Sequence, residues 1–191
     1  MRYSLCKPNK IIRLYPFFLL IIAGLITCTS CQNQKEQLQS VLDKGKEHLE
    51  KENYQQAEKH LKKALETHSQ KAKLHYYLGE AYLNQGNFSK ALESYKKANS
   101  IDPEHTNTQL RLARFYLQSH QTQKTISFLE SILNSNPENV QALILYGRAL
   151  ARKQDYSRAV EKLQKAVQLN PENAVAHILL GNFLMTLDQP K

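Results

Sequence analysis

The cysteines, the most reactive side chains of this sequence, all lie at the start of the chain. They are Cys6, Cys28 and Cys31. A disulfide, a thiolate zinc site or a cysteine nucleophile would need cysteines in the body of the fold. Everything after Cys31 must therefore fold and act without these chemistries.

The other polar residues form no catalytic or metal-binding pattern. The seven histidines include no HExxH motif and no paired ligand spacing, and no serine lies in a G-x-S-x-G context. Two histidines, His75 and His177, lie 102 residues apart and are expected to pack against neighbouring helices. Glu58, Lys62 and Lys63 are expected on a solvated outer face. We therefore predict that the protein is not an enzyme and holds no metal or cofactor.

The composition is that of a folded protein with a moderately basic body. The 191 residues are 41% hydrophobic and 23% charged, which excludes disorder throughout. Removing residues 1–30 removes four of the 26 basic residues and none of the 17 acidic ones, which lowers the formal net charge from +9 to +5. A charge of this size mainly favours solubility, and we expect no nucleic-acid partner.

Residues 1–30 have the features of a secretory leader. Four basic residues and no acidic residue precede an apolar run from Leu14 to Ile26. This order is typical of a signal peptide. The run is shorter than the roughly 20 residues that cross a bilayer as a helix. A permanent membrane anchor would require Ile11 and Ile12 to join the run past Arg13.

Two cysteines follow the apolar run, in the segment Leu25-Ile26-Thr27-Cys28-Thr29-Ser30-Cys31. A cysteine directly after an apolar leader resembles the lipobox of bacterial lipoproteins, in which a leucine stands three residues before the modified cysteine and a small residue directly before it. Cys28 has the leucine, whereas Cys31 has the small residue. We favour lipidation of Cys31, with Cys28 as the alternative, because the processing enzyme must fit the residue beside the scissile bond. Ordinary cleavage after Ser30 would instead leave a soluble exported protein.

The body of the chain repeats every 34 residues. Small residues recur at this interval, at Gly45, Gly79, Ala113, Gly147 and Gly181. A second series follows twelve residues later, at Ala57, Ala91, Thr125 and Ala159, and a third seven residues after that, at Ala64, Ala98, Ile132 and Ala166. Self-similarity at one fixed period indicates a stack of identical supersecondary units.

The repeat resembles the tetratricopeptide repeat (TPR). The family pattern of Leu-Gly, Tyr, Ala, an aromatic residue, Ala and Pro is present as Leu78-Gly79, Tyr82, Ala91, Tyr95, Ala98 and Pro103. The resemblance implies an all-α fold, a right-handed superhelical solenoid of stacked antiparallel helix pairs with about four and a half units. We place the units at 38–71, 72–105, 106–139 and 140–173, with a half unit at 174–187, after a polar tether at 31–37.

The small residues are expected to let the two helices of a unit approach closely. A bulky residue at Gly147 should overpack this contact and destabilise the fold by roughly 1–3 kcal/mol. Unit 3 departs from the pattern, with Ala113, Thr125 and Ile132 in place of Gly, Ala and Ala. We expect its helices to lie farther apart and the curvature of the solenoid to change there.

Stacked pairs of this kind curl so that their first helices line a concave face. The TPR resemblance assigns to this groove Lys46, Lys73, Tyr76, Glu80, Leu110, Arg111, Arg114, Ile144, Arg148, Arg152 and Asn182. Because arginine binds a carboxylate with two hydrogen bonds, we expect a protein partner whose helix or extended segment carries apolar and acidic residues. In the alternative interpretation, the apolar lining only packs adjacent first helices and the arginines are solvated.

The last predicted helix, residues 174–185, is apolar nearly all round and is expected to lack a covering helix. Terminal units of a solenoid normally carry a polar outer face. We predict a self-association or partner site here, which would give a homodimer, at Ile178, Leu179, Phe183 and Leu187. The alternative is that this helix only seals unit 4.

Together these features predict a protein–protein interaction scaffold that is exported and lipid-anchored at the bacterial cell envelope, at the outer rather than the inner membrane. In architecture it is similar to TPR lipoproteins that assist pilus secretins or outer-membrane assembly, but architecture alone does not choose among such roles. The alternative is a signal-anchored inner-membrane or cytoplasmic adaptor, or a secretion chaperone.

Overall fold

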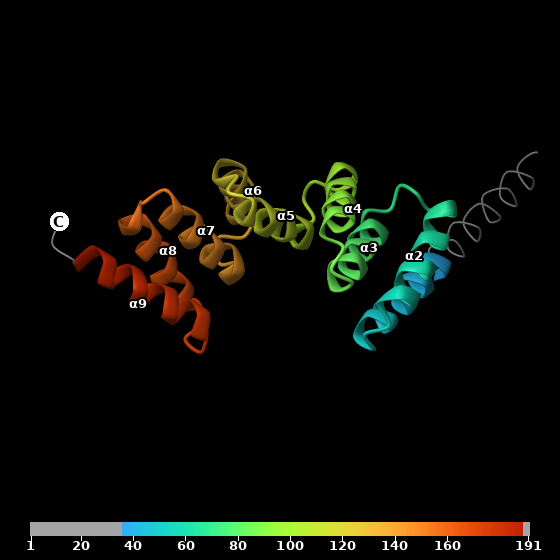
Figure 1. Cartoon of the computed structure of the whole chain (residues 1–191), viewed down its shortest axis with the longest axis horizontal. Coiled ribbons are helices and arrows are strands. Elements are labelled where there is room, and N and C mark those ends of the chain that lie inside the picture. The colour runs from blue at the N-terminus through green and yellow to red at the C-terminus, as the bar shows by residue number, and fades with distance from the viewer. Residues whose placement is uncertain (1–35, 189–191) are drawn as a thin grey trace, which may run out of the picture.

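The computed structural model describes residues 36–188 as a row of antiparallel helix pairs (Figure 1). Residues 36–50 are helical and pair with α2 (Tyr54–Thr67). The following pairs are α3 (Ala72–Asn84) with α4 (Phe88–Ile101), α5 (Thr106–Gln118) with α6 (Thr122–Ser135), and α7 (Val140–Arg152) with α8 (Tyr156–Leu169), and the row ends in α9 (Ala174–Asp188). No strand occurs between residues 36 and 188. The predicted all-α solenoid of helix pairs is confirmed.

The predicted leader and its two candidate lipidation sites lie outside the described residues. Most of the predicted tether does so as well, but residues 36 and 37 already belong to the helix that ends at residue 50.

The helices keep the 34-residue period of the sequence. The first helices of the pairs, which we call A helices, begin at Ala72, Thr106, Val140 and Ala174. The second helices, which we call B helices, begin at Tyr54, Phe88, Thr122 and Tyr156. Every A–B turn has a positive backbone φ at the same place, at Glu52, Gly86, His120 and Gln154. Glycine adopts this conformation most readily, so three units accept local strain to form the same turn.

Side-chain caps mark the starts of the A helices α7 and α9. The amide oxygen of Asn139 accepts a hydrogen bond from the backbone N–H of Ala142 at 2.9 Å, and Asn173 does the same for Ala176 at 3.0 Å. Such caps satisfy backbone donors that the first helical turn leaves open. They set where α7 and α9 begin and thus which side chains face the concave side.

Glycines on the A helices lie directly against large side chains of the B helices. A Cβ atom on Gly79 would lie 2.6 Å from Cε1 of Tyr95. On Gly147 it would lie 2.9 Å from Cγ of Leu163 and 3.2 Å from the carbonyl oxygen of Ala159. A backbone oxygen cannot move aside cheaply, which gives the overpacking expected at Gly147 a structural basis.

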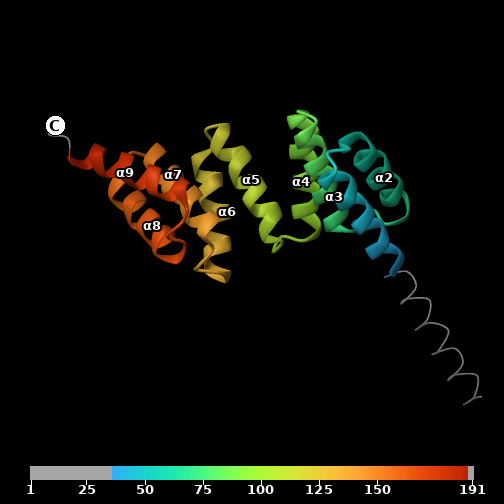
Figure 2. The same cartoon turned by 90° about the horizontal axis from the view of Figure 1, so that it is seen from below.

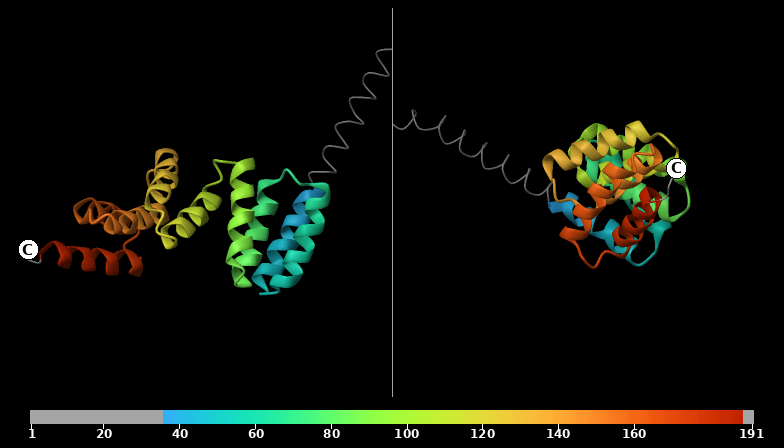
Figure 3. Two further views of the ribbon diagram at one scale, coloured as in Figure 1. Left: turned by 45° about the horizontal axis from the view of Figure 1, so that its top comes forward. Right: turned by 90° about the vertical axis from the view of Figure 1, so that its left-hand side faces the viewer.

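The solenoid changes direction where unit 3 begins. Helix α4 contacts α5 less extensively than α2 contacts α3, α6 contacts α7 or α8 contacts α9. Within unit 3, α5 also contacts α6 less extensively than α3 contacts α4, in the direction expected from Thr125 and Ile132, which are both fully buried. Figure 2 and the left view of Figure 3 show α5 inclined relative to α4.

Candidate protein-binding groove

Two neighbouring clefts lie along the A helices. The smaller, of about 250 Å³, is lined by Tyr76, Asn107, Leu110, Arg111, Arg114 and Gln141. The larger, of about 410 Å³, is lined by residues of α5, α7 and the start of α9: Arg114, Leu117, Gln118, Gln141, Ile144, Leu145, Arg148, Asn173 and Val175. Because Arg114 and Gln141 line both clefts, the two form one continuous surface, which we call the A-helix groove.

At one end of this groove, Arg111 is bonded to another predicted groove residue. Its Nε donates to Oε1 of Glu80 at 2.7 Å, and its Nη2 donates to Oε2 at 2.5 Å. The hydroxyl of Tyr95 donates to Oε1 of Glu80 at 2.6 Å. The Glu80 side chain is 13% exposed and that of Arg111 is 30% exposed. The carboxylate and the guanidinium that we expected to meet a ligand therefore neutralise each other.

Aromatic rings enclose this ion pair. The Tyr76 ring lies 5.9 Å from the Tyr95 ring and 5.1 Å, edge-on, from the His105 ring. Burial first, and the charge of Glu80 second, raise the pKa of both tyrosines. Burial alone would lower the pKa of Arg111, but its bonds to Glu80 outweigh this and raise it. We call Tyr76, Glu80, Tyr95, His105 and Arg111 the junction cluster, since it ties α3 and α4 to α5.

Arg114 and Arg148 are the groove cations that have no acidic partner among residues 36–188. Neither makes an ion pair in this part of the chain, and both are exposed. Burial, followed by the positive charges of Arg111 and Arg148, lowers the pKa of Arg114. An arginine nevertheless stays protonated at neutral pH. The groove therefore presents two guanidinium groups whose charges are not neutralised, which is a favourable setting for a ligand carboxylate.

Besides Glu80, which lines neither cleft, four predicted groove residues lie elsewhere. Lys46 places its Nζ 5.4 Å from the centre of the Tyr77 ring. Arg152 places Nη1 3.0 Å from Nδ1 of His120, in the turn between α5 and α6. Lys73 and Asn182 are exposed but line neither cleft. The structure does not bring these four to the A-helix groove.

The groove also contains residues that the prediction missed. Asn107, Gln141 and Val175 occupy the second place of their units, which Lys73 occupies in unit 2. Their shared place in the repeat could therefore have identified them as groove residues. The apolar residues Leu110 and Ile144, by contrast, are buried and mainly pack the A helices together, as the alternative interpretation held. Apolar surface for a ligand comes chiefly from Tyr76 and Val175.

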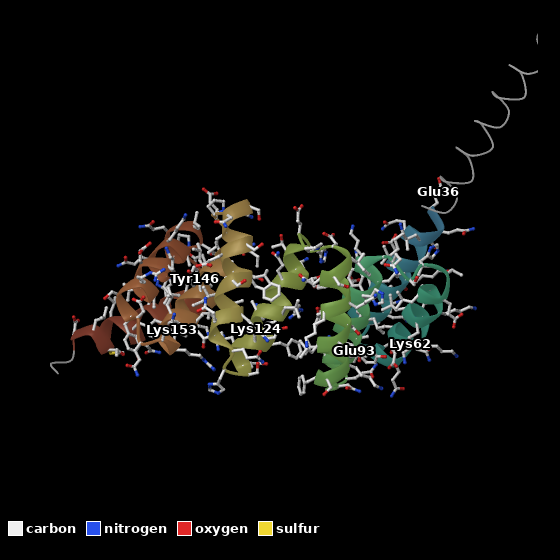
Figure 4. The ribbon with its side chains drawn as sticks, turned by 90° about the horizontal axis from the view of Figure 1, so that it is seen from above. Glu36, Lys62, Glu93, Lys124, Tyr146 and Lys153 are labelled. Atoms are coloured by element: carbon white, nitrogen blue, oxygen red, sulfur yellow. The ribbon has the colours of Figure 1, made fainter. Side chains whose placement is uncertain are left out.

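A larger cleft, of about 710 Å³, lies on the other side of α3, between α2 and α4. Its floor includes Tyr82, and the Nζ atoms of Lys62 and Lys90 lie 5.6 and 5.5 Å from the centre of that ring. Figure 4 labels Lys62 on α2 and Glu93, which lines this cleft from α4. Charges of both signs are mixed here, so this cleft selects a partner by charge less clearly than the groove does.

The histidines placed by the repeat have structural contacts. Nε2 of His75 lies 2.9 Å from the carbonyl oxygen of Ser69, and Nε2 of His177 lies 2.8 Å from that of Pro171. Within residues 36–188, no group of three or more His, Cys, Asp or Glu side chains is placed to hold a metal ion. No helix in that range has both the length and the apolar character needed to cross a bilayer.

The predicted association residues of α9 divide between two faces. Ile178 is 63% exposed and Leu187 is 43% exposed. Leu179 and Phe183 instead pack against the core of unit 4, and the Phe183 ring lies 5.8 Å from that of Tyr156. For these two residues the self-association prediction is wrong, because α9 turns them inward to seal the unit. The exposed apolar side is completed by Val175, Leu184 and Met185.

The comparison with known families decides the identity of the repeat. Residues 27–174 match the family described as the cytochrome c-type biogenesis protein H TPR domain. The chain belongs to this TPR family. It is a TPR scaffold for protein–protein interaction, and the resemblance seen in the sequence is confirmed. No curated protein sequence matches the chain.

Solved structures show the same TPR fold. MamA from Desulfovibrio magneticus RS-1, from residue 41 to its end, is 23% identical with a TM-score of 0.71, and the match covers 79% of this chain and 85% of that one. PilF of Pseudomonas aeruginosa is 20% identical with a TM-score of 0.72, over 80% of this chain and 70% of that one. At these identities, the likeness concerns the fold alone.

Proposed function

We propose that this TPR protein is a non-catalytic scaffold, exported and lipid-anchored at the cell envelope, whose A-helix groove holds a segment of a partner protein while an envelope or secretion complex assembles. The observation that carries the binding role is the presence of Arg114 and Arg148, without acidic partners in the described chain, side by side along one groove.

The groove geometry favours an extended ligand with carboxylates. Arg114 and Arg148 occupy the same place in successive units, on α5 and α7. A segment that reaches both must cross the A helices along the solenoid. Its carboxylates would accept paired hydrogen bonds from the arginines, and its apolar side chains would contact Tyr76 and Val175.

Site-specific photo-crosslinking in cells tests the groove. A photoreactive residue at Gln141, which lines both clefts, should form an adduct with a partner protein, whereas one at the exposed Gln164 of α8 should not. Replacing Arg114 and Arg148 by Ala should reduce the Gln141 adduct about tenfold or more, because two charge-assisted contacts are lost. An adduct that is unaffected by this double variant would exclude the arginines from binding.

The proposed location at the cell envelope rests on the leader-like residues 1–30 and on the two candidate lipidation cysteines. Labelling with radioactive palmitate and cell fractionation test this part separately. The label and membrane association should be lost in Cys31→Ala and kept in Cys28→Ala. A membrane-bound protein without label in the unaltered chain would favour the alternative, an adaptor held by its uncleaved leader or a secretion chaperone.

The family match favours a second candidate for the pathway, since the family description names cytochrome c-type biogenesis. On this proposal the segment in the groove belongs to a component of that process. Haem-stained gels of cells that carry the Arg114→Ala, Arg148→Ala double variant should then show less c-type cytochrome at an unchanged level of the scaffold. A normal content of c-type cytochrome would exclude this second candidate and leave the role in envelope assembly as the proposed function.

A further inference from the structure

The outer side of α9 repeats half of a contact that is complete elsewhere in the chain. In units 1, 2 and 4, the glycine of the A helix lies under a large side chain of the B helix. A Cβ added to Gly45 would lie 2.8 Å from Leu61, and one added to Gly79 would lie 2.6 Å from Tyr95. A Cβ added to Gly147 would lie 2.9 Å from Leu163. A Cβ on Gly181, the equivalent residue of α9, meets nothing within 4 Å.

The residues beside Gly181 are uncovered in the same way. Leu184 is 39% exposed, whereas its repeat equivalents Tyr82 and Leu150 are 5% and 2% exposed. Figure 1 shows α9 at the end of the row, with α7 and α8 on one side of it. We call Gly181 and Leu184 the α9 socket.

The complete units show what fills such a socket. Their B helices all carry a small residue, a large residue four positions later, and a small residue three positions after that. The three examples are Ala57, Leu61 and Ala64; Ala91, Tyr95 and Ala98; and Ala159, Leu163 and Ala166. The large residue covers the glycine, and the two alanines let the helix backbones approach.

The same spacing also occurs on A helices, at Ala72, Tyr76 and Gly79 in unit 2 and at Ala174, Ile178 and Gly181 on α9. On α9 this pattern is not used within the described chain, since Ala174 and Ile178 are exposed. Residues 174–187 also contain no Lys, Arg, Asp or Glu. Two copies can therefore bring this face together without opposing like charges, although the body of the protein is basic.

We propose that α9 binds α9 of a second copy of this chain in a two-fold antiparallel pair. If the symmetry axis passes between Leu179 and Leu180, then Ile178 of each copy lies over Gly181 of the other. Both sockets are filled by one symmetric contact, as an isologous interface requires. Ala174, Ile178 and Gly181 line neither cleft of the A-helix groove, so the inference does not depend on the function proposed for the groove.

Light scattering coupled to size exclusion, on the full chain over a range of concentrations, tests the proposal. Gly181→Ile should weaken dimerisation about tenfold or more, because the added side chain blocks the close approach of the helices. Since nothing lies within 4 Å of the added Cβ, the variant should fold, with an unchanged circular dichroism melt. Thr186→Ile, which adds the same side chain off this face, should dimerise like the unaltered chain.

A compensating variant makes the test specific. Ile178→Gly alone should also weaken the dimer, but the double variant Ile178→Gly, Gly181→Ile exchanges the large and the small residue and should restore it to within about threefold, as paired residues in a double-mutant cycle do. A monomer at all concentrations would overturn the proposal. Stronger association of Gly181→Ile would also overturn it, because that result is expected if the apolar surface is only nonspecifically adhesive. So would a double variant that dimerises no better than the two single variants.

Discussion

Arg111 and Arg114 lie three residues apart on α5, yet they belong to two regions that differ in whether the charge of the arginine is neutralised by an ion pair. In the junction cluster, Arg111 is held by Glu80 and covered by tyrosine rings. In the A-helix groove, Arg114 and Arg148 face a cleft and form no ion pair with any acid of residues 36–188. One residue type therefore forms an internal ion pair at one place on α5 and is left without an ion pair three residues later.

The repeat explains how this difference arises. Glu80 is the ninth residue of unit 2, and it meets Arg111, the sixth residue of unit 3. One unit later, the ninth place is Arg114 and the sixth place is Leu145, and both line the larger cleft. An arginine in place of the acid at the ninth place, and a leucine in place of the arginine at the sixth, remove the ion pair between units and leave an open cleft.

Among the variants that test this difference between the two regions, Glu80→Gln is expected to change the free energy of unfolding most. The variant leaves the guanidinium of Arg111 largely buried without a counter-charge. The free energy of unfolding should fall by about 2 kcal/mol, less than for a wholly buried pair because Arg111 is partly exposed. Urea unfolding measures this loss. Glu47→Gln, which breaks the exposed pair with Lys51, is the control and should change nothing measurable. An equally silent Glu80→Gln would show that the junction pair is not structural.

A smaller effect is expected from pH, acting on His105 of the junction cluster. Its Nδ1 lies 2.6 Å from Oγ1 of Thr108, and burial lowers the pKa of this histidine. A lowered pKa in the folded state contributes stability that is complete above the unfolded value of about 6.5 and is lost as the pH falls below it. His105→Gln should therefore lose less stability than the unaltered chain between about pH 7.5 and about pH 5. An identical loss in both proteins would remove His105 from the acid response.

The smallest effect on stability is expected from Arg148→Ala in the groove. This arginine forms no ion pair in the described chain and adds to the charge that lowers the pKa of Arg114. Removing it should change the free energy of unfolding by less than about 0.5 kcal/mol. Thermal melting in parallel with Glu80→Gln gives the comparison directly, and a loss as large as that of Glu80→Gln would mean that the groove arginines are structural.

The 34-residue interval was sufficient to predict the fold, because small residues at fixed places define both helices of each unit. It could not show which arginines are neutralised. The bond between Glu80 and Arg111 joins residues on different A helices, and its formation depends on side-chain directions that spacing does not give. On α9 the difficulty was different. A helix that is apolar nearly all round has no periodicity to indicate its buried face, so Leu179 and Phe183 were placed on the wrong side.

Nuclear magnetic resonance of the arginine Nε–Hε groups would test the central claim most directly. The probe is a short acetylated peptide that alternates leucine and glutamate, added to the labelled protein. The account predicts that the signals of Arg114 and Arg148 shift as the peptide binds, whereas that of Arg111 stays in place because Glu80 already holds it. Peptide binding that moves Arg111, or that leaves Arg114 and Arg148 unmoved, would contradict the claim.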